Sequence, residues 1–153
     1  LANARRVEDV HDLIADAVER GAELLCGGNR MNRKGNFYMP TVLKNVPEDA
    51  RIMREEPFGP VTVLNAYAHL NAAIRAANST PYALGAYGFT RSAETADLLS
   101  TELDAGMVAI NSFVPMVIDS PISGRRFSGY GCEGGPEGLA AYTITKFITR
   151  ADA

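Results

Sequence analysis

Strand and helix patterns alternate from Val61 onward, and this order constrains the fold more than any other feature of the sequence. Strand patterns cover residues 61–67, 84–90 and 106–111, and helix patterns cover 70–77 and 93–103. Because a helix separates each strand from the next, the connections can cross over and leave neighbouring strands parallel. The sequence therefore predicts an α/β fold built on a parallel sheet. Its run 106–111 is almost continuously apolar, which is typical of a strand buried on both faces.

The part before Val61 predicts a helix and a pair of strands. Asn3 is a good helix cap, and apolar residues recur at helical spacing as far as Gly21. Strand patterns follow at 22–26 and 37–43, separated by a Gly-Gly turn and a polar loop. A short helix at 137–142 and an alternating, half-exposed strand at 143–149 are expected near the other end of the chain.

A rigid turn is expected at residues 55–61, which read EEPFGPV. Its two prolines fix φ and remove backbone donors, so the stretch suits neither a helix nor a central strand. One hypothesis is a turn whose acids are simply solvated. Another is that a carboxylate and the aromatic ring hold a flat ligand that bears hydroxyl groups. Taken alone, the stretch favours the first hypothesis.

Charge and cysteine content exclude several classes of function. A net charge of −3 and a pI near 5.4 argue against binding to nucleic acid or to an anionic membrane surface. No apolar run approaches the roughly 18 residues that a spanning helix needs. Cys26 and Cys132 are far apart in a chain with two histidines, which argues against a zinc site. Free thiols fit a reducing cytoplasm.

One motif match is rejected on its context. Residues 129–134 match GxGxxG, but no apolar strand precedes them and Pro136 interrupts the expected helix. Only 19 residues follow Gly134, too few for the rest of a dinucleotide-binding unit. These glycines are expected to form a tightly packed loop instead.

Four ordered pieces of the sequence carry a family resemblance. They read GAELLCGG at 21–28, FYMPTVL at 37–43, EEPFGPV at 55–61, and SGYG followed by EGG at 128–135. Together they resemble the C-terminal part of an NAD(P)-dependent aldehyde dehydrogenase over nearly the whole chain. The tail is most similar to the succinate-semialdehyde dehydrogenase-like branch.

The resemblance implies a fold, a reaction and partners. The fold is a parallel-sheet portion of the catalytic domain, expected at residues 1–141, with an oligomerisation strand and tail at 142–153. In the family, a cysteine thiolate attacks a small aldehyde to give a thiohemiacetal. Hydride passes to NAD or NADP, and water activated by a glutamate hydrolyses the thioester. A homo-oligomer is implied.

Site residues follow from the resemblance, position by position. Glu56 is expected to accept hydrogen bonds from the nicotinamide ribose, and Phe58 to pack beside the nicotinamide. Asn111 closes a strand near the substrate entrance. The residues that fall where the family lines its aldehyde tunnel are Val114, Met116 and Ile122.

Departures from the family pattern limit what the chain is expected to do. No Gly-Gln-x-Cys segment is present, so neither Cys26 nor Cys132 corresponds to the nucleophile, and the general base and dinucleotide-binding domain would lie upstream. Cys132 stands where the family usually has Arg, and Ser123 where it usually has Gly. The chain is therefore expected to be an inactive fragment, and its start at Leu1 favours this view. The alternatives are a stand-alone, non-catalytic assembly module and an unrelated α/β domain.

Overall fold

The computed structural model describes residues 1–152, which form two compact units. The first spans Leu1–His69, and the second begins at Leu70. Each unit is mixed α/β and contains a parallel pair of strands.

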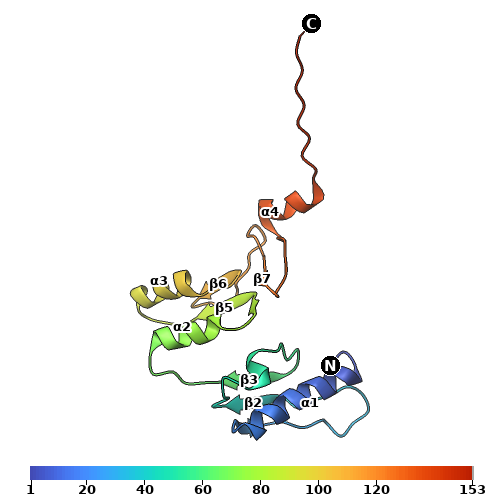
Figure 1. The fold of residues 1–153 in the computed structure, drawn as a ribbon, viewed down its shortest axis with the longest axis vertical. Coiled ribbons are helices and arrows are strands. Elements are labelled where there is room, and N and C mark those ends of the chain that lie inside the picture. The colour runs from blue at the N-terminus through green and yellow to red at the C-terminus, as the bar shows by residue number, and fades with distance from the viewer. Residues whose placement is uncertain (153) are drawn as a thin grey trace. The chain divides into compact units, whose positions relative to one another are not determined.

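The first unit packs one long helix on a three-stranded sheet (Figure 1). Helix α1 spans Ala4–Glu19, and the Asn3 side chain accepts a hydrogen bond from Arg6 N at 2.9 Å, as the cap prediction required. The strands are β1 (Glu23–Cys26), β2 (Thr41–Lys44) and β3 (Val61–Leu64), in the order β1-β2-β3. β1 runs antiparallel to β2, whereas β3 runs parallel to it, with Thr41 opposite Val61.

The core of this unit lies between α1 and the strands, because the helix presents one apolar stripe. Its buried residues are Val7, Val10, Leu13, Ile14, Ala17, Ala22, Tyr38, Leu43, Val46, Ala50 and Ile52. The 3₁₀ helix η1 (Arg51–Met53) is fixed to α1 through Asp16, whose carboxylate accepts from Arg51 N at 2.8 Å. The bonds from Arg51 N and from the Arg20 guanidinium lower the pKa of Asp16 below its ordinary value. Helix α1 thereby positions the segment that leads into residues 55–61.

The second unit is built around a βαβ arrangement. Strands β5 (Gly85–Gly88) and β6 (Met107–Ile110) are parallel, and helix α3 (Ala93–Glu102) connects them. Leu99 of α3 lies close against Gly88, where an added Cβ would come within 2.8 Å of the leucine side chain. This close approach explains why a glycine occupies the strand beneath the helix. Helix α2 (Leu70–Asn78) precedes the pair (Figure 1).

Three smaller elements complete the second unit. β4 (Tyr82–Ala83) pairs antiparallel with β7 (Arg125–Arg126), and the chain then forms α4 (Gly135–Leu139) and the 3₁₀ helix η2 (Ala140–Tyr142). Beyond Thr143 the backbone is extended and forms no strand within the described residues. The expected strand at 143–149 is thus absent from the chain taken singly, since it has no partner there.

The α/β class with parallel strands is confirmed, with two corrections. The strand that begins at Val61 takes its parallel partner from β2, which precedes it, and η1 lies in the crossover between them. The strand at 106–111 is not buried on both faces, because Ala109 is buried while the other residues of β6 are half-buried. No helix within residues 1–152 combines the length and apolar character that crossing a membrane requires. In the same range, no group of three His, Cys, Asp or Glu side chains could hold a metal ion.

Candidate functional site

The two adjacent acids of the 55–61 turn have different environments. Arg51 donates two hydrogen bonds to the Glu55 carboxylate, at 2.8 and 2.9 Å. This guanidinium lowers the pKa of Glu55 below its ordinary value. Glu56 is exposed and makes no ion pair or side-chain hydrogen bond within the described part of the chain. The first acid therefore stabilises the turn, and the second keeps its carboxylate available.

Phe58 is held in an unusual conformation at the outer point of the turn. Its φ is 34°, in the left-handed region that non-glycine residues rarely adopt, and its side chain is 69% exposed. Gly59 follows and lies directly against α1, where a Cβ would come within 2.6 Å of Val10 Cγ2. An exposed aromatic ring on a strained backbone is the kind of feature that function maintains.

The ends of the turn are fixed. On one side Arg51 holds Glu55, and on the other Thr41 N donates to Pro60 O at 2.8 Å as β3 begins. Between them stand a free carboxylate and a free ring face. A carboxylate accepts hydrogen bonds from paired hydroxyl groups, and the ring offers an apolar surface to a planar group. The geometry fits the hydroxyl-bearing ligand that the sequence allowed as one hypothesis.

The Asn111 side chain, in the second unit, holds two strand ends together. Its side chain accepts from Thr90 N at 2.8 Å and donates to Thr90 O at 2.9 Å, which ties the end of β6 to the end of β5. Its φ of 55° also turns the chain out of the strand. Each polar atom of the amide makes one hydrogen bond in this chain, and Asn111 fixes where the following loop starts.

The loop 112–118 is largely exposed, so its apolar side chains are not part of the core of this chain. Phe113 is 79% exposed and Ile118 is 99% exposed, and Val114 and Met116 are exposed as well. Phe113 packs against Phe89, with ring centroids 4.7 Å apart, and lies 6.3 Å from Tyr87. This aromatic cluster was not predicted, although Tyr87 and Phe89 at alternate positions of the expected strand 84–90 were a usable signal.

The loop is fixed at its far end by an ion-pair cluster. Asp104 accepts from both Arg125 and Arg126, and these two guanidinium groups lower its pKa below the ordinary value. Arg126 also donates to Asn78 O at 2.9 Å and Thr80 O at 2.7 Å. Both ends of segment 112–124 are therefore fixed, the first by Asn111 and the second by the ion pairs with Asp104.

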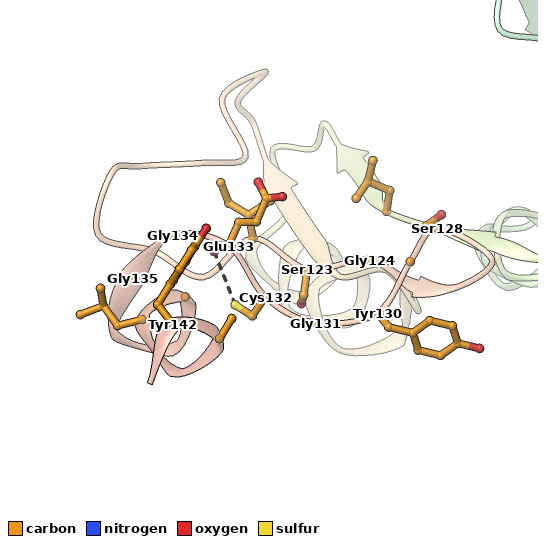
Figure 2. Close-up of a pocket in the computed structure, with 16 residues that line it drawn as sticks. Ser123, Gly124, Ser128, Tyr130, Gly131, Cys132, Glu133, Gly134, Gly135 and Tyr142 are labelled. Atoms are coloured by element: carbon orange, nitrogen blue, oxygen red, sulfur yellow. Dashed lines mark hydrogen bonds between the residues drawn. The ribbon is translucent and has the colours of Figure 1, made fainter. Parts of the chain in front are cut away.

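A cleft of about 840 Å³ lies beside this return (Figure 2). Its lining residues are Leu84, Ile122, Ser123, Gly124, Ser128 to Gly135, Gly138, Leu139, Ala141 and Tyr142. Of the tunnel residues expected from the sequence, Ile122 lines the cleft, while Val114 and Met116 do not. In Figure 2 the Cys132 thiol points toward the Glu133 backbone, at 3.5 Å from its oxygen.

The glycine loop is less tightly packed than expected. A Cβ on Gly134 would come within 2.6 Å of Ser120 O, so this position is close-packed. Gly129 and Gly131 have no heavy atom within 4 Å of such a Cβ, and both have positive φ. These two glycines are required by the backbone conformation, which has positive φ, and not by close packing.

Comparison with curated proteins gives matches over almost the whole chain. A model described as the aldehyde dehydrogenase family matches residues 1–148. The 4-(hydroxymethyl)benzenesulfonate dehydrogenase of Comamonas testosteroni is 42% identical over 97% of this chain and 31% of its own length. A succinate-semialdehyde dehydrogenase of Paenarthrobacter nicotinovorans is 38% identical over 99% of this chain and 34% of its own. The chain spans about a third of the length of these relatives.

Solved structures give the same result for the fold. Lactaldehyde dehydrogenase from Escherichia coli superposes with a TM-score of 0.92 at 35% identity, covering 97% of this chain and 31% of that one. An NAD-dependent aldehyde dehydrogenase from Sinorhizobium meliloti gives 0.87 at 35% identity, covering 93% and 28%. An NADP-dependent enzyme of E. coli gives 0.88 at 36% identity, covering 93% and 30%.

Proposed function

The chain belongs to the aldehyde dehydrogenase family, and we propose that it forms part of an enzyme that oxidises a small aldehyde to a carboxylate with NAD or NADP. The observation that carries the proposal is the 55–61 turn, where the free Glu56 carboxylate and the exposed Phe58 ring stand on a fixed backbone. The solved structures of an NADP-dependent enzyme and of an NAD-dependent aldehyde dehydrogenase are similar to this chain and support either cofactor.

The residues of the turn fit part of a nicotinamide dinucleotide. Glu56 can accept from two vicinal ribose hydroxyls, and the Phe58 ring can pack against the flat nicotinamide. Residues 55–61 contain two acids and no basic residue, and Arg51 is engaged by Glu55. The Glu56 carboxylate and the Phe58 ring therefore suit the sugar and the base. When bound, the dinucleotide supplies the hydride acceptor of the oxidation.

The proposal gives this chain no nucleophile. Cys26 lies in β1 of the first unit, Cys132 lies in the glycine loop of the second, and neither stands in a Gly-Gln-x-Cys segment. We assign nucleophilic attack and base-assisted hydrolysis to residues outside this 153-residue chain. The 153-residue chain alone is expected to be inactive.

The extended segment 143–149 supports assembly with further copies. Ile144 is 97% exposed and Phe147 88% exposed, and the backbone has no strand partner within residues 1–152. An extended segment with exposed apolar side chains can pair as a strand with another chain. The proposal includes a homo-oligomer in the cytoplasm, a compartment that suits two free thiols. The same segment would serve a non-catalytic assembly module, which is the second candidate.

One experiment separates the two candidates. The complete polypeptide that contains this 153-residue chain is purified and mixed with a panel of aldehydes and either NAD or NADP. The formation of reduced nicotinamide is then followed. Aldehyde-dependent reduction with one of the cofactors supports the enzyme. Oligomerisation without any reduction across the panel would refute it and leave the assembly module. The 153-residue chain serves as the inactive control.

A further inference from the structure

Asp16 of α1 holds the start of η1 with a carboxylate that is largely covered. Its Oδ2 accepts from Arg51 N at 2.8 Å, and its Oδ1 accepts from Arg20 Nε at 2.9 Å. The Asp16 side chain is 17% exposed, whereas the side chains of the Arg51–Glu55 ion pair are 48% and 50% exposed. A charged acceptor strengthens a hydrogen bond to a backbone N–H, while an exposed ion pair contributes little. The attachment of this segment to α1 therefore depends on Asp16.

The backbone that Asp16 holds leads directly into the turn. Arg51 O accepts from Arg54 N at 2.9 Å and from Glu55 N at 2.8 Å. The single turn of η1 thus ends on the first residue of the 55–61 stretch. Because the same peptide units join Arg51 to Glu55, a shift of Arg51 N is passed along the backbone to the residues that follow, of which Glu56 is the next.

Helix α1 also holds the other side of the turn. A Cβ on Gly59 would come within 2.6 Å of Val10 Cγ2, so the backbone there lies directly against the helix. Val10 and Asp16 lie about 9 Å apart along the axis of α1. Glu56 and Phe58 therefore stand between two attachments to one helix. A carboxylate and a ring that contact neighbouring parts of one ligand need their separation fixed to within about 0.5 Å.

We propose that Asp16 is a positioning residue for the cofactor, and that its bond to Arg51 N places Glu56 for contact with the nicotinamide ribose. The inference rests on the proposed function, because it takes Glu56 as the ribose acceptor. Asp16 does not touch the ligand and acts through the backbone of residues 51–55. Without its bond the turn keeps the attachment at Gly59, so the unit stays folded. The Glu56 carboxylate is then less well placed, and hydrogen bonds weaken steeply with poor geometry.

The test compares two substitutions of Asp16 in the complete polypeptide. Asp16→Ala removes the acceptor, whereas Asp16→Asn keeps an oxygen for Arg51 N and loses the charge that Arg20 uses. Calorimetric titration with NAD and with NADP gives the dissociation constants, and thermal melting reports the fold. For the cofactor that the parent binds more tightly, we expect Asp16→Ala to weaken binding about fivefold and Asp16→Asn to stay within about twofold of the parent. Asp12→Asn, at an exposed acid one turn earlier on α1, is the control and should leave the constant unchanged.

A double-mutant cycle separates positioning from a merely structural role. Since Asp16 acts through Glu56, Asp16→Ala should weaken the cofactor less than about twofold in a Glu56→Gln background. The same loss in both backgrounds would overturn the inference, as would equal affinity in Asp16→Ala and the parent. These two results leave the proposed function standing. If Glu56→Gln alone does not weaken cofactor binding, the ribose role in the proposed function fails and the inference fails with it.

A second pair of variants reaches the same bond from the donor. Arg51→Ala and Arg51→Pro both remove the guanidinium, but only proline also removes the N–H. Ala50 has an extended backbone with ψ of 140°, and proline suits the first residue of a helix, so the change fits locally. We expect Arg51→Pro to bind the cofactor about fivefold more weakly than Arg51→Ala. This pair decides the question when Asp16→Ala fails to fold, and equal affinities would overturn the inference.

Discussion

Replacing each acid of the 55–61 turn by glutamine should separate cofactor binding from stability. Glu55→Gln and Glu56→Gln are the same chemical change on adjacent residues, so each is the control for the other. Glu55 is bound by Arg51 through two hydrogen bonds, whereas Glu56 has no side-chain partner within the described residues. The first change should affect the fold and the second the ligand.

The size of the Glu56 effect follows from the bonds it would make. A hydrogen bond to a charged group contributes about 1.5–3 kcal/mol, and glutamine keeps one acceptor oxygen but loses the charge and the second. A net loss of ~2 kcal/mol corresponds to roughly a 30-fold fall in cofactor affinity. For Glu55→Gln we expect a slightly lower Tm, because an exposed pair contributes little.

Calorimetric titration of the complete polypeptide with NAD and NADP measures the affinity, and steady-state kinetics measures kcat/KM. Thermal melting of both variants reports the fold. Unchanged dissociation constants and kcat/KM in Glu56→Gln would refute the ribose role. A loss of cofactor affinity in Glu55→Gln equal to that in Glu56→Gln would show that the turn acts only as a whole.

Three further predictions concern stability and assembly. Asn111→Ala removes both bonds to Thr90 from a left-handed position, so Tm should fall by several degrees, the effect of about 1–2 kcal/mol, and Asn111→Gly should recover part of it. The pKa of Asp104 is depressed, so its contribution to stability is present above its ordinary value of 3.8 and is lost as pH falls through the lower folded value. Asp104→Asn should accordingly lower Tm near neutral pH and make Tm vary less with pH below about 4 in a melting series. The same dependence of Tm on pH in the variant and the parent below about pH 4 would contradict this. Ile144→Lys with Phe147→Lys should give a smaller species in sedimentation velocity, and an unchanged species would exclude segment 143–149 from the interface.

The sequence predicts the local elements well, because helix caps and apolar periodicity are local properties. Asn3 and Ser92 cap helices as their residue types suggest, and the crossover from β5 through α3 to β6 follows the expected order. The partner of β3 could not be predicted, since strand pairing is decided by contacts distant in sequence. The pattern after Val61 pointed to a later strand, while the structure joins β3 to β2.

The site residues also divide into features that the local sequence predicts and features that depend on distant contacts. The spacing of Arg51 and Glu55 at i and i+4 is a usable signal for their pairing, and it would have singled out Glu56 from the residues alone. The use of the Asn111 amide by Thr90 has no such signal, because it depends on the register of β5 against β6. The exposure of the loop 112–118 is likewise a property of the packed chain. Whether Asn111, Val114, Met116 and Ile122 contact a substrate stays a prediction.

The uneven distribution of buried residues has a consequence for how the protein can change. The first unit holds a continuous cluster of buried apolar side chains beneath the 55–61 turn. Within the described part of the second unit, the buried apolar side chains are Ile74, Ala83, Leu99 and Ala109. Amide hydrogen exchange should therefore be slowest in α1 and β2 and faster around the loop that follows β6. A half with little packing of its own can accept new side chains at small energetic cost. Substitutions on the exposed surface of the second unit can then accumulate without disturbing the half that holds the turn.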